Sequence, residues 1–248
     1  MNPEVFPSAY LSELDPEKYM ILLTSDRFSP RYDTIRYNAY HVFPRNRIHD
    51  FFPPDIMDYE QKAYWLRCFS EIAYSRNLEG NIAECGVFQG GFANLMNKFF
   101  PDKKCYLFDT FEGFDDRDLT VEKTIHHSSF TEQKNLLLFQ KTSVPYVLSK
   151  MRHPEQIILK KGYIPETLDG VDDRFCFVHL DMDLFAPMYD ALKFFYPRMV
   201  KGGAMLLHDY YNQDLPGVRK AVGDYEQLIG RQLCLVPHVS SIIIMKTE

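Results

Sequence analysis

Hydrophobic residues from position 55 onward follow first a helical and then an alternating pattern of elements. Over residues 55–78, apolar side chains such as Ile56, Tyr59 and Ala63 recur at steps of three and four, which predicts one amphipathic helix ending at Gly80. Short apolar runs then predict strands at residues 81–85, 104–108, 157–160, 175–180 and 204–207. Helical patterns lie between several of them, at residues 91–100, 187–198 and 215–229.

Strands that alternate with helices imply βαβ units and a mostly parallel sheet. The run at 175–180 is apolar on both faces, as in a buried parallel strand. Two more runs, at 232–236 and 240–245, flank Pro237-His238 and predict a closing antiparallel pair. We therefore expect an α/β fold with a Rossmann-like, doubly wound, mostly parallel seven-stranded sheet, which is the arrangement of class I methyltransferases.

Two regions depart from this regular pattern. Residues 1–54 are rich in proline and aromatic residues, and we predict an irregular arm with short helices around 17–23, followed by one domain over 55–248. An arm that a single domain does not fully bury favours a homo-oligomer. The long stretch between the second and third strands, about 115–150, carries a helical run around 135–150. We expect it to form a lid over a ligand, the alternative being a crossover helix with a loop.

Composition narrows the class of partner. The chain has 248 residues, 46% of them hydrophobic, which is enough for one large core. Its net charge of −6 argues against a nucleic-acid partner, because phosphate binding requires clustered Lys and Arg. The five cysteines show no C-x-x-C spacing, so we expect no zinc site and a reducing compartment. No apolar run suits a membrane span or a signal peptide, and we expect a cytoplasmic protein without a membrane partner.

The end of the first strand predicts a site for a small ligand. Glu84 precedes Gly86 and Gly90, and the spacing differs from the G-x-G-x-x-G fingerprint that clamps a pyrophosphate. An acidic residue before the turn suits a cationic amino group, and S-adenosylmethionine (SAM) carries an ammonium and a sulfonium but no phosphate. Asp109, at the end of the second strand, is placed to accept ribose hydroxyls. The alternatives are a strand–helix turn without a ligand and an aspartate that caps a helix.

Acidic residues also follow the fourth and fifth strands. Asp181 and Asp183 share one face of an extended segment, and His208-Asp209 ends the neighbouring strand. Such groups converging at one sheet edge would repel each other, and a divalent cation relieves that. Oxygen ligands favour Mg²⁺ or Ca²⁺, while the imidazole of His208 also admits Mn²⁺ or Fe²⁺. The alternative is that the aspartates cap the following helix and His208 packs in the core.

These segments resemble the macrocin O-methyltransferase family, whose members use SAM to methylate sugar hydroxyls of antibiotics such as tylosin, mycinamicin and novobiocin. The resemblance covers roughly residues 55–248, and residues 19–27 resemble the family's segment that closes over the cofactor. The matching stretches are NIAECGVFQGGFAN at 81–94, YLFDTFEGF at 106–114, KGYIPETL at 161–168, VHLDMDLF at 178–185, YPRMVKGGAMLLHDY at 196–210 and PGVRKAV at 216–222.

The resemblance implies a role for each matching residue. The methionine part of SAM would lie on the turn formed by Glu84, Cys85, Gly86, Val87 and Gly90. The ribose would lie at Asp109, beside Thr110 and Phe111, and the adenine beside Gly162 and Tyr163. Asp181 would bind a metal as well as border the cofactor, and Asp183 would be the base. The family's second metal pair, usually two aspartates, falls on His208 and Asp209, a departure that leaves Mg²⁺, Mn²⁺ or Fe²⁺ open.

The sequence thus predicts a SAM-dependent O-methyltransferase with a divalent metal, acting on a hydroxyl of a sugar-type small molecule. In this hypothesis the cation bound by Asp181, His208 and Asp209 lowers the pKa of the hydroxyl, and Asp183 takes its proton. Methylation of a catechol or another vicinal diol, and SAM binding without catalysis, are the alternatives. A nicotinamide oxidoreductase is disfavoured by the missing glycine fingerprint.

Overall fold

The computed structural model describes residues 14–15, 17–19, 21–23, 39, 42–44, 47–50, 54–124, 139–140 and 142–248. The chain divides into two compact units, residues 1–61 and residues 62–248. Most of the predicted arm, of the cofactor-closing segment at 19–27 and of residues 125–141 lies outside the described residues. The homo-oligomer and the domain boundary at residue 54 therefore stay predictions.

The first unit contains a short pair of parallel strands, β1 (Ile21–Leu23) and β2 (Ile48–Asp50). The prediction of helix at 17–23 is therefore wrong for its last three residues. Leu22 pairs with His49, a residue far along the chain, and hydrogen bonds of that kind override a weak local preference for helix. Local periodicity cannot reveal a partner at that separation.

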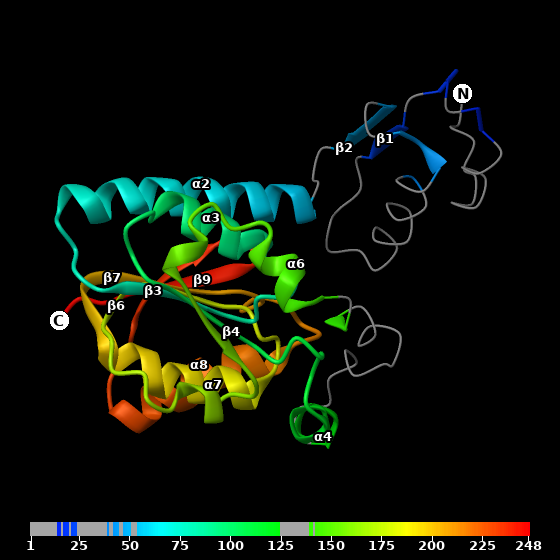
Figure 1. Ribbon diagram of the computed structural model, residues 1–248. Coiled ribbons are helices and arrows are strands. Elements are labelled where there is room, and N and C mark those ends of the chain that lie inside the picture. Colours follow the sequence, from blue (N-terminus) through cyan, green and yellow to red (C-terminus); the bar gives the residue numbers. More distant parts are fainter. Residues whose placement is uncertain are drawn as a thin grey trace. The chain divides into compact units, whose positions relative to one another are not determined.

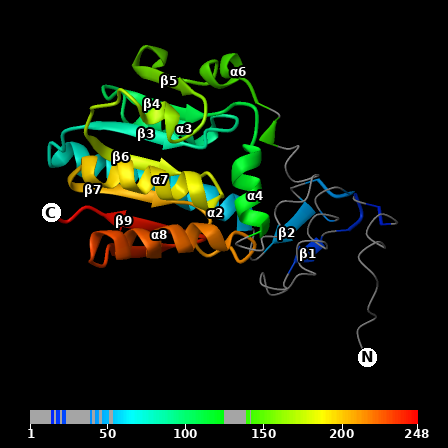
Figure 2. The same cartoon turned by 90° about the horizontal axis from the view of Figure 1, so that it is seen from below.

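The second unit contains the predicted seven-stranded sheet, in the order β5-β4-β3-β6-β7-β9-β8. All neighbours pair in parallel except β9, which runs antiparallel to β7 and to β8. Figures 1 and 2 show this sheet with α7 and α8 on one face and α2 and α3 on the other. The strands are β3 (Asn81–Cys85), β4 (Cys105–Asp109), β5 (Ile157–Lys161), β6 (Phe175–Leu180), β7 (Met199–Leu207), β8 (Cys234–His238) and β9 (Ser241–Met245).

The helices confirm the predicted alternation and add one element. They are α2 (Pro54–Ser75), α3 (Gly91–Phe99), α4 (Asp116–Thr124), α6 (Val144–Leu148), α7 (Phe185–Phe195) and α8 (Pro216–Ile229), with 3-10 turns at Pro154–Gln156, Glu166–Leu168 and Tyr196–Arg198. Helix α4 lies in the predicted lid segment, where no helix was expected before residue 135. Its sequence, DRDLTVEKT, is too polar to show an apolar stripe. Within the described residues, no helix is both long and apolar enough to cross a membrane.

Two element ends differ from the prediction for identifiable reasons. Helix α2 closes at Asn77, with φ of 50°, where Leu78 N–H donates to Ala73 O at 2.8 Å, so Asn77 rather than Gly80 is the C′ residue. Strand β7 starts before its predicted residue 204, because Gly202 and Gly203 exchange backbone hydrogen bonds with Lys246 at 2.7 and 2.9 Å. Cross-strand pairing here outweighs the tendency of a glycine pair to form a turn.

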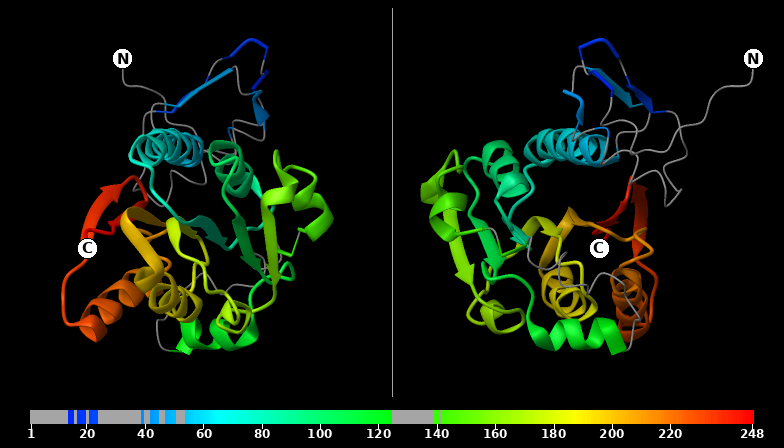
Figure 3. Two further views of the ribbon diagram at one scale, coloured as in Figure 1. Left: turned by 60° about the vertical axis from the view of Figure 1, so that its left-hand side comes forward. Right: turned by 90° about the vertical axis from the view of Figure 1, so that its right-hand side faces the viewer.

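The sheet lies between two layers of helices, which Figure 3 shows from two sides, and it separates two clusters of buried hydrophobic residues. Phe175 and Leu180 of β6 pack with the α7–α8 layer, whereas Phe177 packs with the α2–α3 layer. A register shift between Phe175 and Phe177 changes which side chains face each layer. Beyond that shift Leu180 is fully buried, so Asp181, the next residue, leaves the sheet at its carboxyl edge.

Candidate functional site

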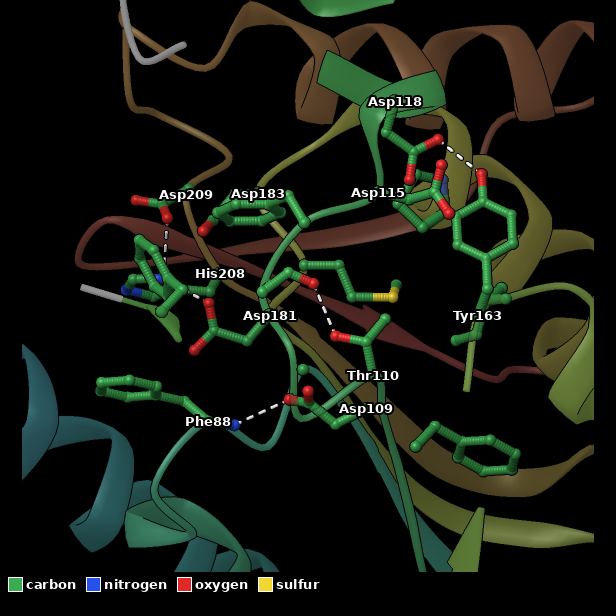
Figure 4. Close-up of a pocket in the computed structure, with 18 of the residues that line it drawn as sticks. Phe88, Asp109, Thr110, Asp115, Asp118, Tyr163, Asp181, Asp183, His208 and Asp209 are labelled. Carbon is green, nitrogen blue, oxygen red and sulfur yellow. Dashed lines mark hydrogen bonds and ion pairs between the residues drawn. The ribbon is translucent and has the colours of Figure 1, made fainter. Parts of the chain in front are cut away.

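A cavity of about 340 Å³ lies at the carboxyl ends of the parallel strands. Most of the predicted site residues line it, and Figure 4 shows ten of the lining residues labelled. The predicted residues that line it are Gly86, Asp109, Thr110, Gly162, Tyr163, Asp181, Asp183, His208 and Asp209. The predicted residues outside its lining are Glu84, Cys85, Val87, Gly90 and Phe111.

Gly86 lets two strand ends meet at the floor of the cavity. Its φ is 85°, and a Cβ at this position would lie 1.9 Å from the carbonyl oxygen of Asp181. The ends of β3 and β6 are joined there by a hydrogen bond of 2.8 Å from Asp181 N–H to Cys85 O. Any side chain at 86 would push the acidic end of β6 away from the turn. Gly90 has a different role, because a Cβ there would meet Val147 of α6 at 2.9 Å.

Asp109 holds the turn that follows β3. Its Oδ2 accepts hydrogen bonds from the backbone N–H of Val87 at 2.7 Å and of Phe88 at 2.9 Å, and its Oδ1 accepts one from Phe111 at 2.6 Å. A carboxylate that satisfies three backbone donors rigidifies the loop around it. The ribose contact expected of Asp109 from the sequence stays a prediction. The sequence did not indicate that Asp109 also organises the turn.

Glu84 is buried outside the cavity lining and pairs with a histidine. Glu84 of β3 and His179 of β6 are register partners, and Glu84 Oε1 lies 2.9 Å from His179 Nδ1. Both side chains are buried, with 2% and 1% exposed. Burial, with the negative charges of Asp181 and Asp109, raises the pKa of Glu84. Its predicted contact with a cationic ligand stays a prediction, while the pair itself supports the strand ends.

Four potential metal ligands converge at one end of the cavity. One ligand atom from each of Asp181, Asp183, His208 and Asp209 lies within 4.8 Å of the others. His208 Nδ1 is 2.9 Å from an oxygen of Asp181 and 2.9 Å from one of Asp209. The cause is the register, because Leu180 pairs with Leu207 and the residues that follow them emerge side by side.

The cluster places three carboxyl groups around one imidazole, so its negative charge exceeds its positive charge. Burial would raise the pKa of Asp181, but the adjacent imidazole of His208, together with His179 and Lys62, outweighs burial and lowers it. The pKa of Asp209 is lowered in the same way. Burial and the charges of Asp209 and Asp181 instead raise the pKa of Asp183. Three carboxyl groups and one imidazole nitrogen form a donor set that suits Mg²⁺, Mn²⁺ or Fe²⁺, so the residues fit a divalent cation.

Two of these acids have left-handed backbone conformations, which determine the direction of their side chains. Asp183 has φ of 63° and Asp209 has φ of 56°. Residues other than glycine adopt this region at a cost, which is typical of functional sites. Asn212, which sequence reasoning missed, also lines the cavity and donates a hydrogen bond of 3.2 Å to Asp209 Oδ1.

The opposite end of the cavity carries acids of α4 that the sequence did not indicate. Asp118 Oδ1 accepts a hydrogen bond of 2.6 Å from the Tyr163 hydroxyl, and the Arg117 guanidinium lies 4.0 Å from the centre of the Tyr163 ring. Glu122, one turn further along α4, accepts a hydrogen bond of 2.5 Å from Phe185 N–H at the start of α7. Asp118 and Glu122 are buried on one face of a polar helix, and their four-residue spacing is the only signal that could have shown it.

Aromatic side chains form another part of the wall. The Phe139 ring lies 5.5 Å from that of Phe88 and 4.9 Å from that of Phe114, and all three residues line the cavity. Edge-to-face and tilted contacts at these distances hold rings in place. Phe88 reaches the wall with φ of 47°, on the turn that Asp109 holds.

Comparison with known proteins places these features in a wider group. The family model described as Macrocin-O-methyltransferase (TylF) matches residues 60–234. The chain is 26% identical over 173 residues to the mycinamicin III 3''-O-methyltransferase of Micromonospora griseorubida, covering 64% of this chain and 65% of that protein. It is 24% identical over 175 residues to the demethyldecarbamoylnovobiocin O-methyltransferase of Streptomyces niveus, covering 64% and 63%. The aligned part thus spans less than two thirds of the length of these relatives.

Solved structures show the same fold. The O-methyltransferase NovP superposes with a TM-score of 0.67 at 20% identity, covering 76% of this chain and 80% of that one. CalS11, a calicheamicin methyltransferase, superposes with a TM-score of 0.55 at 15% identity, covering 95% and 98%. The Rossmann-like α/β architecture predicted from the sequence is therefore confirmed.

Proposed function

The chain belongs to the macrocin O-methyltransferase family, and from this premise we propose that it is a SAM-dependent, metal-dependent O-methyltransferase acting on a hydroxyl of a sugar or sugar-containing small molecule. One observation carries the proposal. The acidic cluster of Asp181, Asp183, His208 and Asp209 lines the same cavity as the turn at Gly86. Donors for a divalent cation and a turn suited to a nucleoside-bearing cofactor thus face one space.

SAM supplies a methyl group on a sulfonium, which is already a good leaving group, so the protein has to position the reactants and activate the nucleophile. Gly86 allows backbone to approach a ligand closely. Asp109 is fixed by its three backbone donors, and a carboxylate has about four lone pairs, so it keeps capacity for a ribose hydroxyl. Gly162 and Tyr163 border the far end of the cavity, where the purine would lie.

A divalent cation would be held by Asp181, His208 and Asp209. When bound, it would supply a Lewis acid that lowers the pKa of an acceptor hydroxyl. We propose Mg²⁺ first because of the oxygen ligands, with Mn²⁺ or Fe²⁺ as alternatives because of the imidazole. Asn212 orients Asp209, and the hydrogen bond from Asn212 reduces the freedom of that carboxylate.

Asp183 is the proposed base. Asp183 is 8% exposed and lines the cavity, so its carboxyl group can face an acceptor without being surrounded by water. It takes the proton of the acceptor hydroxyl as that oxygen forms a bond to the methyl carbon. The carbon–sulfur bond breaks in the same step, and the electron pair stays on sulfur in S-adenosylhomocysteine.

The aromatic wall supports a sugar-type acceptor. Phe88, Phe114 and Phe139 present apolar surface next to a polar cluster. A sugar ring has an apolar C–H face and polar hydroxyls, so it matches a wall of this kind opposite charged groups. The relatives that this chain resembles are O-methyltransferases by name, and the name of one, from Streptomyces olivaceus, specifies a rhamnosyl-bearing substrate.

Two measurements test the proposal. Calorimetry against SAM and against NAD separates a methyltransferase from a nicotinamide enzyme. We expect heat of binding with SAM and none with NAD. Transfer of labelled methyl from SAM to glycosylated and catechol acceptors, with and without EDTA, then tests the acceptor class and the metal. We expect turnover with glycosylated acceptors that EDTA abolishes and Mg²⁺ restores. Binding of NAD but not SAM would overturn the proposal.

A further inference from the structure

The far end of the cavity, away from the metal ligands, has an acidic group for which the proposed reaction has no use. Figure 4 shows Asp118 and Tyr163 on the side opposite His208 and Asp209. Asp118 is 4% exposed, yet it lines the cavity. A buried carboxyl group on a ligand cavity needs hydrogen-bond donors when the ligand excludes water.

Of the two acids at this end, Asp118 has the greater capacity for a ligand. Both oxygens of Asp115 bind the Arg117 guanidinium, Oδ1 to Nε at 2.8 Å and Oδ2 to Nη2 at 2.9 Å. Asp115 Oδ1 also accepts the Arg117 backbone N–H at 2.9 Å. Asp118 receives the Tyr163 hydroxyl on one oxygen, and an ionised carboxylate accepts about four hydrogen bonds in all.

The position of Asp118 is determined by its neighbours. Tyr163 donates to it, and the ring of Tyr163 is covered by Arg117, which also contacts Glu166 at 3.4 Å. Glu122, on the same face of α4, binds the start of α7. Helix α4 is therefore held by two side-chain hydrogen bonds, one to Tyr163 and one to the start of α7, and the Asp118 carboxyl is preorganised rather than free to adapt to any ligand.

The cavity that Asp118 lines has apolar walls, which suit a flat heterocycle. Ile164 and Met182 are buried apolar residues that line the same cavity, 6% and 8% exposed. Apolar side chains bind the faces of an aromatic ring, whereas specificity comes from a few polar groups that meet its edge. An ionised carboxylate only accepts hydrogen bonds, so it selects an edge that donates.

We propose that Asp118 is a specificity-determining residue for the cofactor, and that its carboxylate accepts a hydrogen bond from the exocyclic amine of the SAM purine. This inference rests on the proposed function, because it takes SAM as the ligand of the cavity. Asp118 would then reject a purine that carries a carbonyl in place of the amine, since two acceptors would face each other. Burial raises the pKa of Asp118 to about 6, so the group is mainly ionised at neutral pH and still accepts.

The test compares S-adenosylhomocysteine with S-inosylhomocysteine, in which a carbonyl replaces the amine, by calorimetry on the full chain. We expect the wild-type protein to bind the adenosyl compound about tenfold or more tightly. Asp118→Asn offers an amide N–H to the carbonyl, and the preference should fall below about threefold or invert. Glu166→Gln is the matched control, because Glu166 contacts Arg117 but does not line the cavity, and it should keep the wild-type preference.

Each other outcome counts against the inference. An unchanged preference in Asp118→Asn, or an equal loss of affinity for both compounds, would show that Asp118 does not contact the purine edge. If Asp118→Asn does not fold, Tyr163→Phe takes its place, because it removes the hydroxyl that orients Asp118 and should reduce the preference with little loss of packing. A wild-type protein that binds neither compound would overturn the proposed function itself, which distinguishes the two failures.

Discussion

The carboxylate of Asp109 and the backbone of Phe88 are joined by a hydrogen bond of 2.9 Å, and Phe88 has a left-handed φ of 47°. A bulky residue in this conformation needs outside support. Asp109, at the end of β4, provides that support to the turn after β3. The turn proposed to border the cofactor and the phenylalanine proposed to border the acceptor therefore depend on the same side chain.

Replacing Asp109 should affect both stability and cofactor binding. Asp109→Ala removes the acceptor of three backbone N–H groups, and we expect a loss of about 1–3 kcal/mol in the free energy of unfolding. SAM binding should weaken by about 1–3 kcal/mol as well, through the turn and the ribose contact. Denaturant unfolding and calorimetry measure the two effects. The control is Glu112→Ala, whose exposed carboxylate contacts Lys161. Unaltered SAM affinity in Asp109→Ala would disprove the ribose assignment.

Asp181 and Asp183 should have different functions in the cluster. Asp181→Ala should lose both metal binding and turnover, because Asp181 is a proposed metal ligand. Its carboxylate lies between His179 and His208 and borders the cavity. Asp183→Asn should keep the metal and SAM but lose turnover, since an amide cannot accept the proton. Metal titration and methyl transfer report the two properties. Activity that survives exhaustive EDTA treatment would refute the metal role.

His208 should make metal binding sensitive to mildly acidic pH. An imidazole must be neutral to bind a metal, so affinity should fall as the pH drops through the titration range of histidine. His208→Asp provides an all-aspartate cluster, which should keep its metal to lower pH and prefer Mg²⁺ more strongly. Calorimetric metal titrations between pH 5 and 8 compare the two proteins. Identical pH profiles would mean that His208 is not a ligand.

Asp118 should destabilise the protein as the pH rises. Burial raises its pKa from 3.8 to about 6, so the folded state binds this proton more tightly than the unfolded state. Its contribution to stability is therefore complete below pH 3.8 and is lost as the pH rises through about 6. Asp118→Asn lacks this titrating group. The melting temperature of the variant minus that of the wild type should therefore increase as the pH rises from 3.8 to about 6. A constant difference across that range would argue against the raised pKa.

Hydrogen exchange should show whether α4 is part of a mobile lid. The predicted lid over 115–150 requires amides of α4 to exchange quickly in the free protein and slowly with SAM and acceptor. The bonds from Asp118 to Tyr163 and from Glu122 to Phe185 instead predict protection of α4 without any ligand. Glu122→Ala, which removes the acceptor for Phe185 N–H, should then raise exchange in α4, while Glu71→Ala, at an exposed site on α2, should not.

Sequence patterns alone were sufficient for the architecture of the sheet. Strand β6 was predicted with the bounds it has, and the antiparallel pair β8–β9 was expected. The expected link at Pro237-His238 is wrong, because both residues belong to β8 and pair with Ile242 and Ser241 of β9. The sheet could be predicted because burial on one or both faces leaves a local record in the order of apolar residues. Topological rules then place Asp181 and His208 at the same edge, because parallel strands end together.

Only the tertiary structure decided which predicted residues face the cavity. Glu84 and Gly86 are two positions apart at one strand end, yet Glu84 is hydrogen-bonded to His179 outside the cavity lining, whereas Gly86 lines the cavity. Whether a polar side chain is buried depends on its register partner, and register is a relation between distant segments. The acids of α4 show the same limit, because Asp118 and Glu122 appear in sequence as an ordinary solvated helix face. Their burial comes from Tyr163 and the start of α7, which local periodicity does not encode.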